Sequence, residues 1–241
     1  MWVQLLYGIR YLDIRVGHYP NTPEKFWAVH DFVKINPLYE IIADVRRFLR
    51  STKELVVLDF HRFPTGFEGD NESNHAALLR QLQAELGEFM APDWLGRSVS
   101  LNELWNLNKT LIVTYSHDPS SAFSDVLWSE VRHVWGNQRS APGLLSFLNE
   151  AMNIRKWARY PWAAMSHLTP SQMDVILNPN YGFRELADSI ARNVTRWYRS
   201  NWWNSANIVA TDFFLGNNLI EESIIANRRR QKCKEMSEFD W

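Results

Sequence analysis

The sequence predicts an α/β fold with a mostly parallel sheet, and three observations lead to it. Short runs rich in β-branched and aromatic residues, such as LVVLDF at 55–60 and LIVTY at 111–115, are typical of buried strands. Amphipathic stretches alternate with these runs, as they do in βα units. The length of 241 residues fits one large domain better than two small ones.

The first half of the chain supplies three strands and two helices. The stretch 38–49 places Leu38, Ile41 and Val45 at helical spacing, which predicts an amphipathic helix. A second helix is expected at 75–89. We expect strands at 8–16, 27–32 and 55–60.

The second half continues the alternation. The stretch 183–199 places Leu186, Ile190 and Val194 on one helical face. We expect strands at 111–115, 162–167 and 207–214, and helices at 128–135, 144–152, 183–199 and 219–230. Six strands are fewer than the eight of a closed barrel. We assign 1–230 to a single domain and 231–241 to a polar tail.

The bulk composition narrows the class of protein. With 26 basic and 27 acidic residues, the net charge of −1 gives no support for a nucleic-acid partner. Cys233 is the single cysteine, so the chain can form neither an internal disulfide nor a cysteine metal site. No apolar run is long enough to span a bilayer, and the start of the chain does not read as a signal peptide.

Other features leave the compartment open. Glycosylation triplets occur at Asn71, Asn108 and Asn193, which would suit a secreted protein, whereas a lone cysteine suits a cytoplasmic one. The twelve tryptophans are expected mainly in an aromatic core, and a sugar-stacking or membrane-interface role for a few of them is the alternative. We expect a monomer.

Polar residues occur where the predicted strands end, which is where the reacting groups of an α/β barrel lie. Asp13 and Arg15 are two residues apart in one strand, so their side chains share a face. Together the strand ends offer a cation for a phosphate, an acid for a leaving oxygen and carboxylates to orient them. Singly, each residue has a plain structural explanation, such as a hydrogen-bonded core histidine or a cross-strand ion pair. The further candidates are His30, Asp59, His61, Arg62, Tyr115, Ser116, His117 and Asp212.

Three segments carry a family resemblance: GIRYLDIRVGHYP at 8–20, FWAVHDF at 26–32 and LVVLDFHRFPTGF at 55–67. In this order they resemble the X-domain family of phosphatidylinositol-specific phospholipases C, especially its short single-domain animal members. TLIVTYSHD at 110–118 and ANIVATDFF at 206–214 are also similar to that group. The resemblance implies a distorted, incomplete TIM-like α/β barrel and a phosphoric diester hydrolase of lipid metabolism.

The resemblance also implies roles for individual residues. In the family, the inositol 2-hydroxyl attacks phosphorus, one histidine acts as base and a second protonates the glycerol oxygen. His30 matches the second histidine, Asp13 the carboxylate two residues before Arg15 on the same strand, and Asp212 the aspartate that orients the first histidine. His61, Arg62 and Tyr115 are expected to contact substrate.

Arg15 matches the arginine that the metal-independent members have where calcium-dependent members bind the metal. Calcium needs six to eight oxygen ligands, whereas a guanidinium can bind phosphate oxygens without a metal. We therefore expect neither a metal nor a cofactor. The expected partners are a phospholipid or inositol-phosphate substrate and a peripheral membrane contact.

The first catalytic histidine of the family has no counterpart, since none of the seven histidines lies before Gly8. We therefore expect this chain to lack the first barrel strand and to be impaired as an enzyme. The alternatives are a non-catalytic binder of inositol phosphates or phospholipids, and a magnesium-dependent phosphodiesterase of the glycerophosphodiester type. Arg15 within the expected carboxylate cluster argues against the latter.

Overall fold

The structure is a computed structural model that describes residues 1–31, 33–68, 72–117, 125–155, 158–170 and 182–238. Its chain divides into two units, Met1–Val131 and Arg132–Trp241. Each unit contains its own sheet and its own hydrophobic core.

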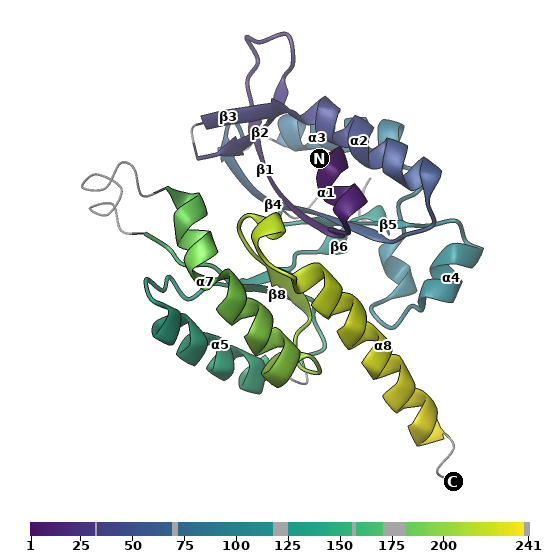
Figure 1. The fold of residues 1–241 in the computed structure, drawn as a ribbon. Helices are drawn as coiled ribbons and strands as arrows, with labels where there is room; N and C mark the ends of the chain where they lie inside the picture. Colours follow the sequence, from purple (N-terminus) through teal and green to yellow (C-terminus); the bar gives the residue numbers. More distant parts are fainter. Residues whose placement is uncertain (32, 69–71, 118–124, 156–157, 171–181, 239–241) are drawn as a thin grey trace. The chain divides into compact units, whose positions relative to one another are not determined.

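The first unit is built around a six-stranded sheet with the order β3-β2-β1-β4-β5-β6 (Figure 1). Strands β1, β4, β5 and β6 are parallel, whereas β2 is antiparallel to both β1 and β3. Its strands are β1 Tyr11–His18, β2 Phe26–His30, β3 Val33–Pro37, β4 Val56–Thr65, β5 Leu111–Tyr115 and β6 Trp128–Ser129. Its helices are α1 Trp2–Tyr7, α2 Leu38–Ser51, α3 Glu72–Leu86, α4 Leu101–Asn106 and the short 3-10 helix η1 Asp93–Leu95.

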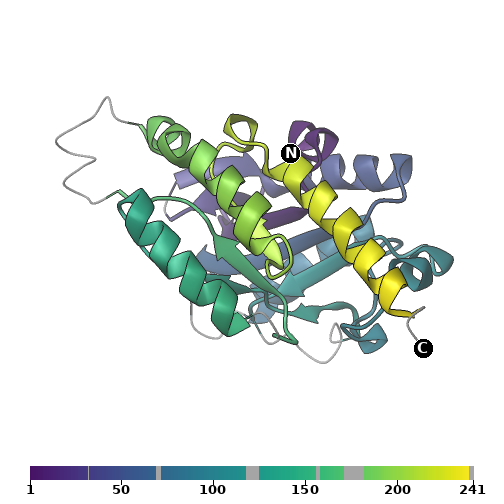
Figure 2. The ribbon, with the colours of Figure 1, turned by 60° about the horizontal axis from the view of Figure 1, so that its bottom comes forward.

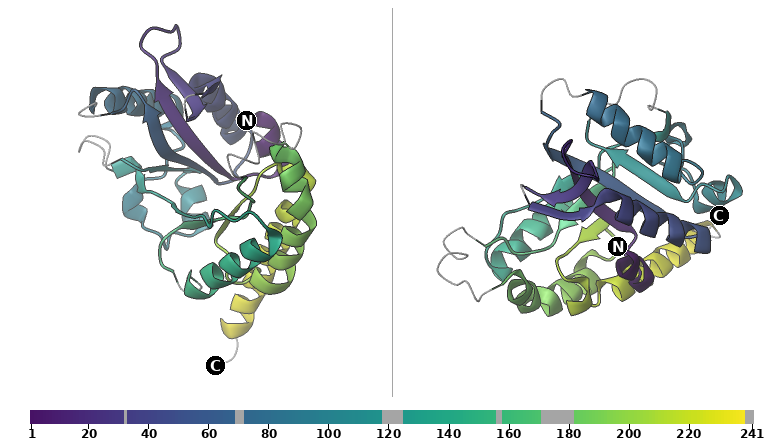
Figure 3. Two further views of the ribbon diagram at one scale, coloured as in Figure 1. Left: turned by 90° about the vertical axis from the view of Figure 1, so that its left-hand side faces the viewer. Right: turned by 90° about the horizontal axis from the view of Figure 1, so that it is seen from above.

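Alternation along the strands separates a core face from a polar face. Leu12 and Ile14 of β1 are buried in the same core as Phe60 of β4 and Val45 of α2. The intervening residues of β1 therefore point to the opposite face of the sheet. Helices α2 and α3 pack side by side, and the loop between β1 and β2 extends beyond the sheet (Figure 3).

The second unit has three parallel strands in the order β7-β8-β9, and helices lie beside them (Figure 2). Trp162 of β8 and Val194 of α7 are almost completely buried in its core. Its strands are β7 Arg132–Val134, β8 Trp162–Met165 and β9 Ile208–Ala210. Its helices are α5 Ala141–Arg155, α7 Phe183–Trp197, η3 Tyr198–Trp202, η4 Phe214–Gly216 and α8 Leu219–Glu238.

The expected α/β class is confirmed, and neither sheet closes into a barrel within the described residues. The strand predicted at 111–115 matches β5, and the helices predicted at 38–49, 144–152 and 183–199 correspond to α2, α5 and α7. None of the described helices combines the length and the apolar character needed to cross a bilayer.

Two expectations about individual elements were wrong, and one strand has an unexpected setting. The helix predicted at 128–135 is replaced by β6 and β7, because Trp128 and Ser129 pair with the end of β5. The strand predicted at 27–32 is confirmed as β2, and it pairs antiparallel with both β1 and β3. The helix expected to end at 230 continues to Glu238, so most of the expected polar tail is helical.

Candidate active site

Asp13 and Arg15 lie on the polar face of β1, as their spacing predicts. Both side chains are half-buried, whereas Leu12 and Ile14 between and beside them are buried in the core. The alternation of the strand therefore presents a carboxylate and a guanidinium on one face, one above the other.

His30 reaches the same region from the antiparallel direction. Because Val16 pairs with Ala28 and His18 with Phe26, the end of β2 lies beside the middle of β1. His30 therefore does not lie at the carboxyl end of a parallel strand, where reacting groups were expected. The β1–β2 hairpin brings it beside β1 instead. Its side chain is 66% exposed, and its Nδ1 lies 3.5 Å from a carboxylate oxygen of Asp31.

A cavity of about 430 Å³ brings these three residues together in the first unit. Asp13, Arg15 and His30 all border it. Its remaining lining residues are Met1, Gln4, Ile14, Ala28, Val29, Ile35, Asn36, Glu40, Ile41 and Asp44.

Two more predicted residues, His61 and Arg62, lie at a β-bulge of β4 and are not among the residues that line the cavity. Along the β1–β4 ladder Asp13 pairs with Asp59, but Arg15 pairs with Arg62, so the bulge leaves His61 and Arg62 opposite Arg15. Neighbouring strands lie about 4.8 Å apart. The two arginines are therefore backbone neighbours, with Arg62 exposed and His61 half-buried.

Asp59 is the residue of this site to which sequence reasoning gave no specific role. It is fully buried and accepts hydrogen bonds from the Tyr11 hydroxyl and the Thr114 hydroxyl, both at 2.6 Å. Burial, followed by the charge of Asp59, raises the pKa of Tyr11 far above its usual range, so Tyr11 remains a donor. The sequence signal for this role is the position of Asp59 inside the apolar run LVVLDF, because a buried carboxylate needs hydrogen-bond partners.

Tyr115 lies in different surroundings from the other predicted substrate contacts. Its ring is 4% exposed, and it belongs to the core cluster on the opposite face of the sheet from Arg15. Its hydroxyl lies 2.8 Å from Nδ1 of the buried His75. Burial also raises the pKa of Tyr115 well above its usual range. This position assigns Tyr115 to packing.

Asp212 follows β9 in the second unit, whereas the other predicted site residues all belong to the first. It comes directly before Phe213, whose φ of 47° places an aromatic residue in the left-handed region. The role expected for Asp212 stays a prediction.

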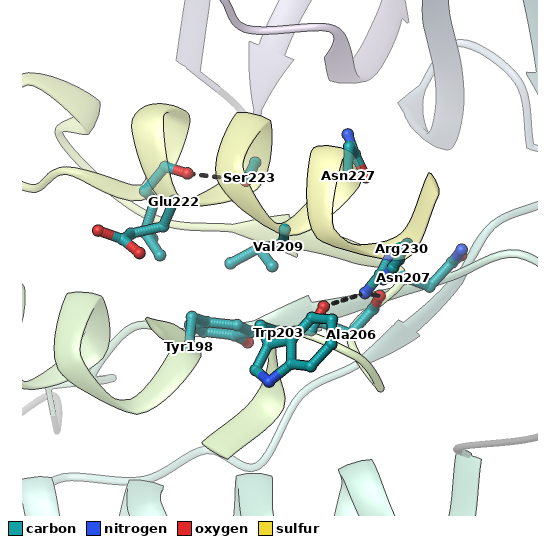
Figure 4. A pocket seen from close by; sticks show the side chains of 11 residues that line it. Tyr198, Trp203, Ala206, Asn207, Val209, Glu222, Ser223, Asn227 and Arg230 are labelled. Carbon is teal, nitrogen blue, oxygen red and sulfur yellow. Dashed lines mark hydrogen bonds between the residues drawn. The ribbon is translucent and has the colours of Figure 1, made fainter. Parts of the chain in front are cut away.

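Two further observations bear on ligands. In the first unit, Nδ1 of His61 lies 4.0 Å from a carboxylate oxygen of Asp59, so these two side chains present potential ligand atoms close together. The second unit has a hollow of about 50 Å³ where Arg230 of α8 donates to the main-chain oxygens of Trp203 and Ala206 (Figure 4). That volume holds a few water molecules and is too small for an inositol ring.

Known proteins of similar sequence provide a comparison for this site. No family model matches the chain. It is 26% identical over 216 residues to PI-PLC X domain-containing protein 1 of Danio rerio, covering 87% of this chain and 67% of that protein. It is 28% identical over 219 residues to PI-PLC X domain-containing protein 3 of Homo sapiens, covering 87% and 66%. The chain thus spans about two thirds of the length of these relatives.

A third relative and a solved structure extend the comparison. The chain is 31% identical to the variant-surface-glycoprotein phospholipase C of Trypanosoma brucei brucei over 154 residues. The matched region covers 62% of this chain and 41% of that protein. A mutant phosphatidylinositol-specific phospholipase C from Staphylococcus aureus superposes with a TM-score of 0.65 at 10% identity, over 88% of this chain and 75% of that one. The expected resemblance is therefore confirmed: the chain is similar to PI-PLC X domain-containing proteins over most of its length and shares the fold of the phosphatidylinositol-specific phospholipases C.

Proposed function

We propose that this chain is the catalytic part of a phosphoric diester hydrolase of the phosphatidylinositol-specific phospholipase C type. The observation that carries the proposal is the cavity bordered by Asp13, Arg15 and His30, because it joins three of the four residues that the resemblance assigns to the reaction. The trypanosome relative named as a phospholipase C supports the same reaction class.

The size and charge of the cavity suit a phosphorylated headgroup. About 430 Å³ falls within the range of small-molecule sites. Arg15 supplies a planar donor that can bind two phosphate oxygens at once. The bulge adds Arg62 as a neighbouring positive charge, which would stabilise the charge that grows on the phosphate during attack.

His30 is proposed as the general acid. Its exposed imidazole would protonate the glycerol oxygen as the bond from phosphorus to that oxygen breaks. Asp13 would orient the substrate or the guanidinium beside it, and Asp212 would orient the base. In this mechanism the guanidinium replaces a metal ion, so we propose that the reaction needs no divalent cation.

The expected rate of phosphodiester hydrolysis depends on a general base. We propose that Arg15 and the cavity around it bind the headgroup, and that efficient turnover requires a general base in addition. General acid–base catalysis typically contributes about 10²- to 10⁴-fold. An experiment that measures both headgroup binding and hydrolysis therefore distinguishes a protein that binds with little turnover from an efficient enzyme.

The test combines binding and turnover in wild type, Arg15→Lys and the control Arg50→Lys. Arg50 is exposed and paired with Glu88 outside the cavity, so it controls for the loss of a guanidinium. Phosphorus NMR on phosphatidylinositol vesicles follows the cyclic product, and titration with inositol phosphate follows binding. We expect Arg15→Lys alone to weaken binding and any turnover. If both variants bind and hydrolyse as wild type does, Arg15 does not hold the phosphate and the proposal fails.

A further inference from the structure

The triplet Asn108-Lys109-Thr110 begins on a surface turn that follows α4 and ends at Thr110, which is 7% exposed. The main-chain N–H of Asn108 donates to Trp105 at 3.0 Å, and that of Lys109 donates to Leu104 at 2.8 Å, which closes the turn. Asn108 has a φ of 53° and is exposed. Asparagine tolerates this left-handed conformation better than most residues, so its amide is presented to solvent without unusual strain.

Trp105 is joined to Asn108 through the main chain, since its carbonyl oxygen accepts the N–H of Asn108. Trp105 stands three residues before Asn108, at the other end of the same turn, and its side chain is 40% exposed. Its indole N–H donates to the main-chain oxygen of Lys53 at 2.6 Å, which fixes the orientation of the ring. Leu101 and Leu107 nearby are also exposed, at 48% and 47%. A fixed, partly exposed aromatic face is the kind of surface on which the apolar face of a sugar packs.

The second described triplet differs at its asparagine and its middle residue, whereas its Thr195 is buried much as Thr110 is, at 9% against 7%. Asn193 lies within α7, is half-buried, and its Oδ1 accepts a hydrogen bond from Arg196. The next residue, Val194, is 1% exposed in the core. The hydroxyl of Thr195 donates to the main-chain oxygen of Ala191 and accepts from the N–H of Asn218. A bulky substituent at Asn193 would oppose the packing of α7, whereas one at Asn108 would meet solvent. The third triplet, at Asn71, lies outside the described residues.

We propose that Asn108 carries an N-linked glycan whose first sugar packs against Trp105. In the transfer, Nδ2 of Asn108 bonds to C1 of the sugar of a lipid-linked oligosaccharide. The bond from C1 to the pyrophosphate oxygen breaks, the lipid pyrophosphate leaves, and the proton from Nδ2 passes to a base of the cell's transferase. This site is separate from the cavity of Arg15 and His30, and the proposal does not depend on the proposed function.

The first test is the mass of the full-length protein isolated from its native source. Digestion with a peptide N-glycosidase removes the glycan and leaves aspartate at position 108, which peptide mass spectrometry locates. We expect the conversion at Asn108 and none at Asn193. An unmodified Asn108 in the native protein, or a glycan at Asn193 in its place, overturns the proposal.

The second test addresses the contact with Trp105. The full-length protein is secreted from a eukaryotic host as wild type, Asn108→Gln, Asn193→Gln, Trp105→Ala and Trp105→Phe. Asn108→Gln should lose the mass of the glycan, and Asn193→Gln should keep it. Removing the glycan should lower the Tm of wild type and of Trp105→Phe, and leave the Tm of Trp105→Ala unchanged. Because each variant is compared with its own deglycosylated form, a general loss of stability in Trp105→Ala does not affect the result. Equal shifts in all three would show that the sugar does not contact Trp105.

Discussion

The imidazole rings of His75 and His117 stack face to face, with centroids 3.8 Å apart and planes within 3° of each other. His75 belongs to α3, and His117 follows β5. On one side of the stack Nδ1 of His75 lies 2.8 Å from the hydroxyl of Tyr115, and on the other Nε2 of His117 lies 2.9 Å from Glu72. The stack therefore ties the first turn of α3 to the residues that follow β5.

The stack should make the stability of the first unit depend on pH. Burial, followed by the charge of His117, lowers the pKa of His75 from its ordinary value to about 4. Between pH 6.5 and 4 the unfolded chain therefore binds a proton at His75 that the folded chain does not. Stability from this group is complete above pH 6.5 and is lost as the pH falls toward 4. At about 1.4 kcal/mol per pKa unit, the loss is at most ~3.5 kcal/mol. Urea unfolding at pH 7 and at pH 4.5 measures it.

The control is the double variant His75→Phe/Tyr115→Phe. It keeps the aromatic shapes and removes both hydrogen-bonding groups, a change that can be nearly neutral. We expect wild type and the double variant to have similar stability at pH 7, and the variant to lose less of it at pH 4.5. The same pH slope in both proteins would show that His75 does not contribute.

Asp59 should be important for folding independently of catalysis. It is fully buried and accepts hydrogen bonds from Tyr11 and Thr114, so Asp59→Ala leaves two hydroxyl groups without their acceptor. Each hydroxyl group that is left buried without a partner costs about 1–3 kcal/mol in the free energy of unfolding. The matched control is Glu54→Gln, which removes an exposed carboxylate paired with Arg10 and should cost less than about 1 kcal/mol. Urea titration of both variants at pH 7 compares them, and equal small losses would contradict the assigned role.

His30→Ala should affect substrates according to their leaving group. A general acid matters most when the departing oxygen is a poor leaving group, so cleavage of phosphatidylinositol should fall by about 10²- to 10⁴-fold. An inositol phosphate ester with a nitrophenol leaving group should lose much less. The kcat/KM values of the full-length protein for the two substrates give the comparison.

Asp31→Asn serves as the control for His30→Ala. Asp31 is the exposed neighbour of His30 and has a φ of 51°, a conformation that asparagine adopts readily. It should retain most activity on both substrates. Equal losses of His30→Ala on good and poor leaving groups would mean that His30 does not donate the proton.

Chelation should leave activity unchanged. Arg15 already supplies a fixed positive charge at the place where the resemblance would otherwise require calcium. Hydrolysis by the full-length protein is measured with and without excess chelator, then with added calcium and magnesium. Loss of activity on chelation and its recovery with calcium would show that Arg15 has been misassigned.

The sequence by itself determined the α/β class and the candidate residues of β1. Alternation of apolar and polar residues within a short strand is a local property, and it put Asp13 and Arg15 on one face while Leu12 and Ile14 went to the core. Helical spacing likewise located α2 and α7. These features depend only on neighbours along the chain, so a single sequence suffices to predict them.

Only the tertiary structure decided which residues meet across strands. The β4 bulge sets Arg62 opposite Arg15, and the hairpin turns His30 back beside β1. Tyr115 packs beside His75 because its side chain points to the core face of the sheet. Register, strand direction and bulges depend on pairing between distant segments, and the spacing of residues within one segment carries no information about that pairing.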